Sequence, residues 1–181
     1  LIKSIAKTSI NYGYVRPKIV ESTQSTSFIK ATALRHPIIE RINTDTNYVP
    51  NDICLGTDDS VNDKTTGILL FGTNASGKSS LMKAVGVNII MAQAGFFVAA
   101  KEFSYSPYEY LFTRINNNDN IFKGESSFAV EMGELRSILK RANNKSLVLG
   151  DELCSGTENI SALSIFSSSV VNLDKRNTNF I

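Results

Sequence analysis

The chain of 181 residues is long enough to form one domain with its own buried core. Hydrophobic residues make up 42% and charged residues 20%, values typical of globular proteins, which excludes a chain that is disordered throughout. Lys and Arg (19) nearly balance Asp and Glu (17), and the net charge of +2 argues against a dedicated nucleic-acid-binding surface. No apolar run reaches the roughly 18 residues of a membrane span.

Cysteine and histidine are too few for a zinc site or a disulfide scaffold. Cys54 and Cys154 form no CxxC pair, and we interpret both as small hydrophobic residues of the interior. The single histidine, His36, has no metal-ligand partner in the sequence and is interpreted as structural. This composition favours a reducing, intracellular environment.

The N-terminal part is predicted to be a helix end followed by short strands. Apolar residues recur at helical spacing over residues 1–10, and Gly13 stops the pattern. Residues 15–62 carry prolines and short apolar runs, which predicts a small β-rich region, and the polar stretch 56–66 predicts a surface loop.

From residue 67 onward, predicted strands alternate with predicted helices. The run 67–71 is wholly apolar, as expected of a strand buried on both faces, and 79–93 is apolar almost all round, as expected of a core helix. Further strands are predicted over 96–100, 108–115, 146–149 and from 177 onward, further helices over 126–143 and 158–173, and a polar loop over 116–125. The alternation predicts an α/β fold with a mostly parallel sheet flanked by helices.

Both ends of the chain indicate a fragment of a longer protein. It begins at Leu1 rather than at a methionine, and it stops at Ile181 inside a predicted strand. We therefore expect residues 1–14 to be the end of a connecting helix and residues 15–181 to be a domain that is incomplete at its C-terminus.

Residues 72–79 read GTNASGKS and match the P-loop pattern G-x-x-x-x-G-K-[ST]. Its glycines let backbone N–H groups curve around phosphate oxygens, and the positive end of the following helix points at the same anion. Lys78 is expected to reach the β- and γ-phosphates, and the Ser79 hydroxyl to ligate Mg²⁺. The expected nucleotide contacts from this turn are Gly72, Thr73, Asn74, Ala75, Ser76, Gly77, Lys78, Ser79 and Ser80.

Two acidic residues follow the predicted strand 146–149. Asp151 is expected to hold Mg²⁺, directly or through water, and Glu152 to lie where a water attacks the γ-phosphate. Adjacent acids after an apolar strand are typical of ATPases whose catalytic base follows the metal ligand, and we find no base-reading loops of a GTPase. The acid pair and the P-loop together favour a Mg²⁺-dependent ATPase.

Two serines open the predicted helix 126–143. The position three residues after Ser126 is Ala129, so no capping box engages the Ser126 hydroxyl, and the helix start can offer N–H groups and a hydroxyl to an anion. Taken alone, the pattern is more typical of an ordinary serine cap. Further along, Arg136, Lys140, Arg141 and Lys145 predict a solvated face.

With these motifs in order, the sequence resembles the ATPase domain of the MutS family of DNA mismatch-repair proteins. The residues before Pro17 resemble the foot of that family's long lever helices. The remaining resemblance is carried by residues 34–37 (LRHP) with Glu40, 48–52 (YVPND), 72–80 (GTNASGKSS), 112–115 (FTRI) with 118–120 (NDN), 126–132 (SSFAVEM) and 147–157 (LVLGDELCSGT). It implies a P-loop fold of the ABC-ATPase type, whereas the LSGGQ signature of ABC transporters is absent.

The resemblance implies roles for three further residues. Tyr48 matches the aromatic residue that stacks on adenine, with a β-region core tyrosine as the alternative. Asn74 matches an amide near the γ-phosphate and the attacking water. Ser126 matches the serine that reaches the ATP of the partner subunit, although a carboxylate at Glu125 would repel phosphate unless it turns to a basic partner.

Three positions depart from the family's pattern. Thr73 and Ala75 stand where the family usually has Pro and Met, and Ser155 stands where it usually has Arg. These variants are similar to the divergent branch of giant viruses and octocoral mitochondria. The family's switch histidine would follow Ile181.

The resemblance implies an ATP-binding and ATP-hydrolysing domain of a mismatch-repair protein. It also implies a dimer of MutS-type subunits that holds DNA through parts outside this sequence, in a mitochondrion, a nucleus or a viral factory. One alternative is a MutS-like ATPase of recombination or organelle genome maintenance that reads no mismatch. Another is a nucleotide-dependent dimerisation module, against which the intact Lys78, Asp151 and Glu152 argue.

Overall fold

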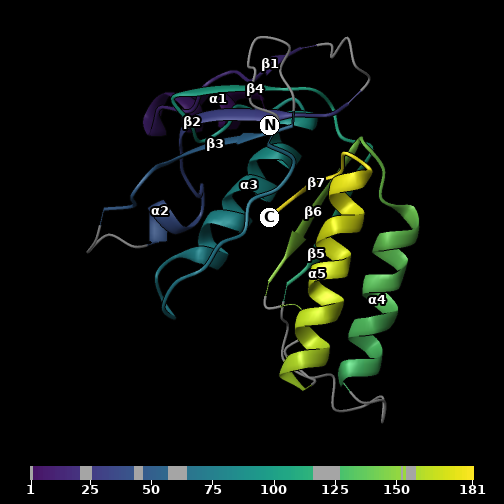
Figure 1. Cartoon of the computed structure of the whole chain (residues 1–181). Coiled ribbons are helices and arrows are strands. Elements are labelled where there is room, and N and C mark those ends of the chain that lie inside the picture. The colour runs from purple at the N-terminus through teal and green to yellow at the C-terminus, as the bar shows by residue number, and fades with distance from the viewer. Residues whose placement is uncertain are drawn as a thin grey trace.

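The computed structural model describes residues 2–20, 26–42, 47–56, 65–115, 127–151, 153 and 158–181. Figure 1 shows two sheets and the helices packed on them. In chain order the elements are α1 (Ile2–Tyr12), β1 (Lys18–Ile19), β2 (Ile29–Leu34), α2 (Ile39–Ile42), β3 (Asn51–Leu55), α3 (Lys78–Gln93), β4 (Glu102–Tyr105), β5 (Tyr110–Arg114), α4 (Ser127–Arg141), β6 (Ser146–Gly150), α5 (Asn159–Lys175) and β7 (Asn179–Phe180). The predicted loop over 116–125 lies outside the described residues.

The predicted helices are confirmed. The helical patterns over 1–10, 79–93, 126–143 and 158–173 correspond to α1, α3, α4 and α5. The short helix α2 was not predicted, because four residues are too few to show a period. Within the described part of the chain, no helix combines the length and apolar character that a bilayer crossing requires.

The first sheet is four-stranded and has the order β1-β4-β2-β3. Strand β2 runs antiparallel to β3 and β4, and β1 runs parallel to β4. The predicted β-rich region is thereby confirmed, although one of its strands, β4, comes after α3. The strand predicted over 96–100 is wrong: Val98 makes only an isolated bridge to Val15. The strand begins at Glu102 instead, where buried and less buried residues alternate.

The second sheet has the order β5-β6-β7, and all its strands are parallel. The prediction of a mostly parallel sheet for the strands after residue 67 holds for this sheet, whereas β4 joins the first sheet and pairs antiparallel with β2. Leu147 and Leu149 of β6 pack into the core that includes α3, whereas Val148 packs with α4 and α5. Helices therefore cover both faces, with α4 and α5 side by side on one of them (Figure 1).

The apolar run 67–71 does not form the buried strand that was predicted. Gly67 bridges Phe180 in parallel, and the Ile68 N–H donates to the Phe180 carbonyl at 3.0 Å. Within the described residues the run makes no further strand pairing, and Leu69 is 55% and Phe71 95% exposed. Apolar character alone therefore did not bury these side chains.

Gly67 is required by the close approach of the Phe180 ring. A Cβ at this position would lie 1.9 Å from Phe180 Cζ, so we expect Gly67→Ala to lower the free energy of unfolding by about 1–3 kcal/mol through overpacking. Gly133 of α4 is the matched control, because a Cβ there meets no atom within 4 Å and Ala favours a helix by about 0.5–1 kcal/mol. Urea unfolding of both variants checks this, and equal shifts would contradict it.

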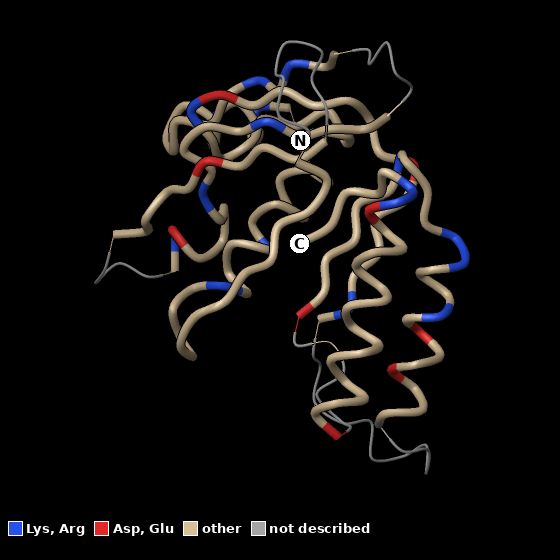
Figure 2. The backbone as a smooth tube through the Cα atoms, in the orientation of Figure 1, with Lys and Arg blue, Asp and Glu red and all other residues tan. Residues whose placement is uncertain are grey.

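Three of the four basic residues predicted to form a solvated face lie on α4, and Figure 2 shows basic positions along this helix. Arg136 and Lys140 are exposed, and the exposed Arg141 lies over the rings of Tyr110 and Phe112 at 5.6 and 5.7 Å. Lys145 is half-buried and forms an ion pair with Glu109 at 3.0 Å. Arg141 thereby makes cation–π contacts with the aromatic residues of the edge strand β5.

Candidate functional site

The turn before α3 contains two residues in the left-handed backbone region, Ala75 and Gly77. Gly77 has φ 97°, a left-handed conformation that glycine adopts without steric cost, and it begins α3. Ala75 has φ 62° and pays about 1–2 kcal/mol for the same region. Among the described residues no side chain caps α3, and its first turn contains no acid. The first N–H groups of α3 are therefore available to an anion.

Lys78, the first residue of α3, folds back over this turn. Its Nζ donates to the carbonyl oxygens of Gly72 and Thr73, each at 2.8 Å. The ammonium is thereby held above the loop rather than out in solvent. A bound phosphate would offer it charged oxygens in place of these neutral carbonyls, and charge-assisted hydrogen bonds are the stronger ones.

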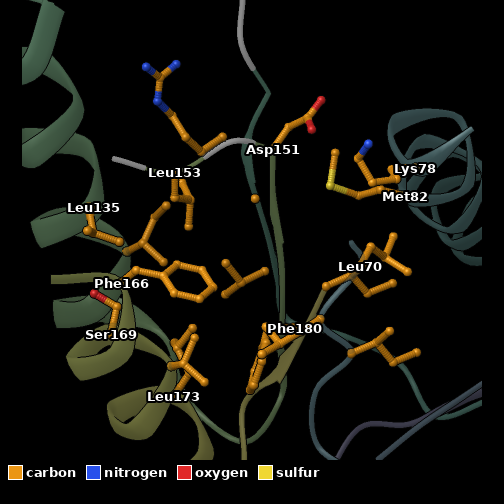
Figure 3. Close-up of a pocket in the computed structure, with 18 of the residues that line it drawn as sticks. Leu70, Lys78, Met82, Leu135, Asp151, Leu153, Phe166, Ser169, Leu173 and Phe180 are labelled. Carbon is orange, nitrogen blue, oxygen red and sulfur yellow. The ribbon is translucent and has the colours of Figure 1, made fainter. Parts of the chain in front are cut away.

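Lys78 and Asp151 line the same cavity, of about 590 Å³ (Figure 3). Lys78 enters from α3, and Asp151 follows the carboxyl end of β6. The Asp151 N–H donates to the Arg114 carbonyl at 2.8 Å, which extends the parallel β5–β6 ladder by one residue. The structure thus brings the predicted lysine and the first predicted acid into one cavity. Glu152 lies outside the described residues.

Arg114 is a residue of this cavity that the sequence analysis did not single out. It ends β5, pairs in register with Gly150, and lines the cavity together with Asp151. Its Nε lies 3.0 Å from Glu134 Oε2 of α4, an ion pair. The signal was present, because residues 112–115 close a predicted strand, and charged residues at the carboxyl end of a parallel strand face the ligand edge.

A second cavity, of about 620 Å³, places Tyr48 beside the P-loop. Tyr48 is half-buried there, and burial, followed by the charge of Glu40, raises the pKa of its hydroxyl. The volume lies within the usual range for small-molecule sites. The P-loop residues on its wall are Ala75, Ser76, Gly77, Lys78 and Ser80.

Lys78 belongs to both cavities, so they meet at the P-loop. Asn74 is exposed on the turn, Ser79 is half-buried in the first turn of α3, and neither residue lines either cavity. Ser126, predicted to act on a partner's nucleotide, lies outside the described residues.

Ser79, which follows Lys78, and Asp151, which shares a cavity with it, carry oxygen groups. No cluster of three or more His, Cys, Asp or Glu side chains occurs in the described ranges. Mg²⁺ is ordinarily held by one or two protein oxygens together with phosphate oxygens and waters. The Ser79 hydroxyl and the Asp151 carboxylate are ligands of this hard oxygen type.

His36 is structural, as predicted. It is 6% exposed, and its Nδ1 accepts hydrogen bonds from the N–H groups of Ile38 at 3.2 Å and Ile39 at 3.3 Å. The imidazole thereby caps the start of α2, which requires an unprotonated Nδ1. Cys54 was predicted to be buried, but this free thiol is only half-buried. Cys154 lies outside the described residues.

The cap at His36 makes stability depend on pH. Burial, and then the charge of Lys83, lowers the pKa of His36 below its ordinary 6.5. Between the two pKa values, the unfolded chain therefore binds a proton at His36 that the folded chain does not bind. The contribution of this group is fully present above pH 6.5 and is lost as the pH falls from there toward the folded pKa. We expect His36→Asn, which keeps an acceptor, to flatten the dependence of unfolding free energy on acidity. Parallel curves for the two chains would contradict this.

Comparisons with known proteins identify the family. The model of MutS domain V matches residues 68–180. A mutS homolog of Acanthamoeba polyphaga mimivirus, named for DNA mismatch repair, is 43% identical over 199 residues, which cover 94% of this chain and 18% of that protein. The mitochondrial DNA mismatch repair protein mutS homolog of Sarcophyton glaucum is 42% identical over 178 residues, 97% of this chain and 17% of its own length.

A bacterial relative gives the same result. The DNA mismatch repair protein MutS of Prochlorococcus marinus (strain NATL1A) is 40% identical over 167 residues, which cover 91% of this chain. The chain spans 17–18% of the length of these three relatives. The family match begins immediately before the P-loop and ends at β7, so it includes both Lys78 and Asp151. The chain therefore belongs to the MutS family and contains its domain V.

Proposed function

We propose that this chain binds ATP with Mg²⁺ at the P-loop and hydrolyses it. The observation that carries the proposal is that Lys78 and Asp151, which are distant in sequence, line one cavity at the start of α3. The free N–H groups at the start of α3 and the ammonium of Lys78 would hold the β- and γ-phosphates. The ring of Tyr48 would stack on adenine in the adjoining pocket.

The metal and the attacking water would be served by separate residues. The Ser79 hydroxyl and the Asp151 carboxylate would hold Mg²⁺, which supplies charge neutralisation at the phosphates when bound. Glu152 would accept a proton from the water that attacks the γ-phosphorus, the bond to the bridging oxygen would break, and ADP would leave with its electron pair. Asn74 would orient that water by a hydrogen bond.

The site would be completed by a second copy of the chain. Ser126, directly before α4, would donate its hydroxyl to the γ-phosphate held by the partner, where the positive end of α4 also stabilises negative charge. We expect hydrolysis to rise faster than linearly with protein concentration until the dimer saturates. The dimer would thus be the active unit.

Mixed dimers test this arrangement directly. Chains with Lys78→Ala and chains with Ser126→Ala should regain activity when mixed, because one of the two sites then combines an intact P-loop with an intact Ser126. The other site carries both lesions. Activity that never exceeds the sum of the two separate variants would reject the trans role and leave Ser126 as a helix cap.

In the whole protein, ATP binding and hydrolysis by this domain would switch a DNA-bound dimer between conformational states during mismatch repair. The relatives from a virus and a mitochondrion are named for DNA mismatch repair, which supports this assignment. A role in recombination or organelle genome maintenance is the second candidate. Loss of repair, rather than of recombination, when the gene is deleted would favour the first.

A further inference from the structure

The motif formed by residues 34–37 and Glu40 has no part in the proposed chemistry, yet it lies between α1 and the nucleotide pocket. We propose that Arg35 is a positioning residue that joins the C-terminal end of α1 to the P-loop helix α3. Through this joint, nucleotide binding at the start of α3 changes the stability of the last turn of α1. The effect of nucleotide on α1 rests on the proposed function, whereas the connection of α1 to α3 through Arg35, here called the joint, does not.

The side chain of Arg35 holds the end of α1. Its Nη2 donates to the Tyr12 carbonyl at 2.9 Å, and its Nε donates to Glu40 Oε2 of α2 at 2.7 Å. The last carbonyls of a helix lack partners within it, and the helix dipole favours a cation there. Helix α1 has no basic residue in its own last turn, so the guanidinium of Arg35 supplies that cation from outside.

The backbone of Arg35 is held by α3. Asn88 of α3 is 0% exposed, and its Nδ2 donates to the Arg35 carbonyl at 3.0 Å. The Oδ1 of Asn88 accepts from the Ala99 N–H at 2.8 Å, and the Arg35 N–H donates to the Ala99 carbonyl at 2.8 Å. A buried network in which each partner is engaged is stiff, because any displacement leaves a polar group unpaired.

The same joint reaches the pocket of Tyr48. Ile39 of α2 lines that pocket, and the next residue, Glu40, is the one that grips Arg35. The Tyr14 hydroxyl, which follows α1, donates to the Pro37 carbonyl at 3.3 Å. A nucleotide would therefore touch both elements that fix Arg35, namely α3 at its first turn and α2 at the pocket wall. Movement of either one reorients the guanidinium that caps α1.

Hydrogen exchange of the amides in residues 9–13 tests the joint. In the wild-type chain we expect a non-hydrolysable ATP analogue with Mg²⁺ to slow exchange there about 5-fold or more. In Arg35→Met we expect faster exchange without nucleotide and a nucleotide effect below about 2-fold, while analogue affinity stays within about 3-fold. Arg35→Lys keeps the positive charge but lacks the planar guanidinium. Its nucleotide effect on exchange should therefore lie between those of the wild-type chain and Arg35→Met.

Arg41→Met is the matched control. Arg41 lies on α2 beside Glu40 and also contacts α1, with its guanidinium 4.2 Å from the centre of the Tyr12 ring. The hydrogen bonds of Asn88 go to Arg35, Ala84 and Ala99 instead. This variant should keep the full nucleotide effect. Wild-type exchange that is unchanged although the analogue binds, or a full effect in Arg35→Met, would overturn the transmission and leave the proposed function intact. A folded chain that binds no analogue would overturn both the transmission and the proposed function. Exchange in residues 9–13 of Arg35→Met without nucleotide, compared with Arg41→Met, would still show whether Arg35 holds the end of α1.

Discussion

Glu152→Gln should slow ATP hydrolysis by about 10²–10⁴-fold while leaving nucleotide binding nearly unchanged. The amide keeps the shape of the carboxylate but cannot accept the proton of the attacking water. Phosphate release and equilibrium binding of an ATP analogue, measured on the same sample, separate the two effects. Glu158→Gln is the control, because Glu158 is an exposed residue at the start of α5.

Asp151→Asn should behave differently from Glu152→Gln. Asp151 lines the cavity with Lys78, and its replacement removes a charged oxygen from the proposed metal site. The expected result is a higher Mg²⁺ concentration for half-maximal hydrolysis, without an equal loss at saturating Mg²⁺. Two variants that respond identically in both assays would show that the division of roles between the acids is wrong.

Lys78→Ala should weaken nucleotide binding by about 10- to 150-fold. The variant removes a charge-assisted contact to phosphate that contributes about 1.5–3 kcal/mol. It also frees the carbonyls of Gly72 and Thr73, which stand on an exposed turn where water can replace the ammonium. The fold should therefore survive the substitution.

Fluorescence titration with a labelled ATP analogue measures this effect. Lys83→Ala is the matched control, since Lys83 is exposed on the same helix and lines neither cavity. An unchanged affinity in Lys78→Ala would contradict the assignment of residues 72–79 as a nucleotide-binding P-loop. Equal losses of affinity in Lys78→Ala and Lys83→Ala would indicate a non-specific charge effect.

The sequence predicted the helices better than the strands, and the reason is physical. Helix α3 is recognisable in the sequence because it is long and follows the glycine of the P-loop pattern. A short apolar run, by contrast, indicates burial but does not indicate whether a partner strand exists. Val98, Ala99 and Ala100 are fully buried as their apolar character predicts, yet they form no strand. Phe71 is apolar and 95% exposed, and its run makes only one described bridge, between Gly67 and Phe180.

Local motifs predicted the candidate site, whereas its supports depend on tertiary contacts. Lys78 is the first residue of helix α3 and Asp151 follows strand β6, and in α/β folds ligand-binding residues converge at such positions. Asn88 could not be assigned a role from sequence, because its partners, Arg35 and Ala99, lie on different segments. Its one signal was its position as the polar residue within the apolar stretch 84–92.

Calorimetric titration of the chain with a non-hydrolysable ATP analogue measures nucleotide binding without relying on hydrolysis. We expect saturable binding at one site per chain, which weakens when Mg²⁺ is removed and is weaker for the corresponding GTP analogue. A folded chain that shows no saturable binding up to about 1 mM nucleotide, which corresponds to roughly −4.1 kcal/mol, would contradict it.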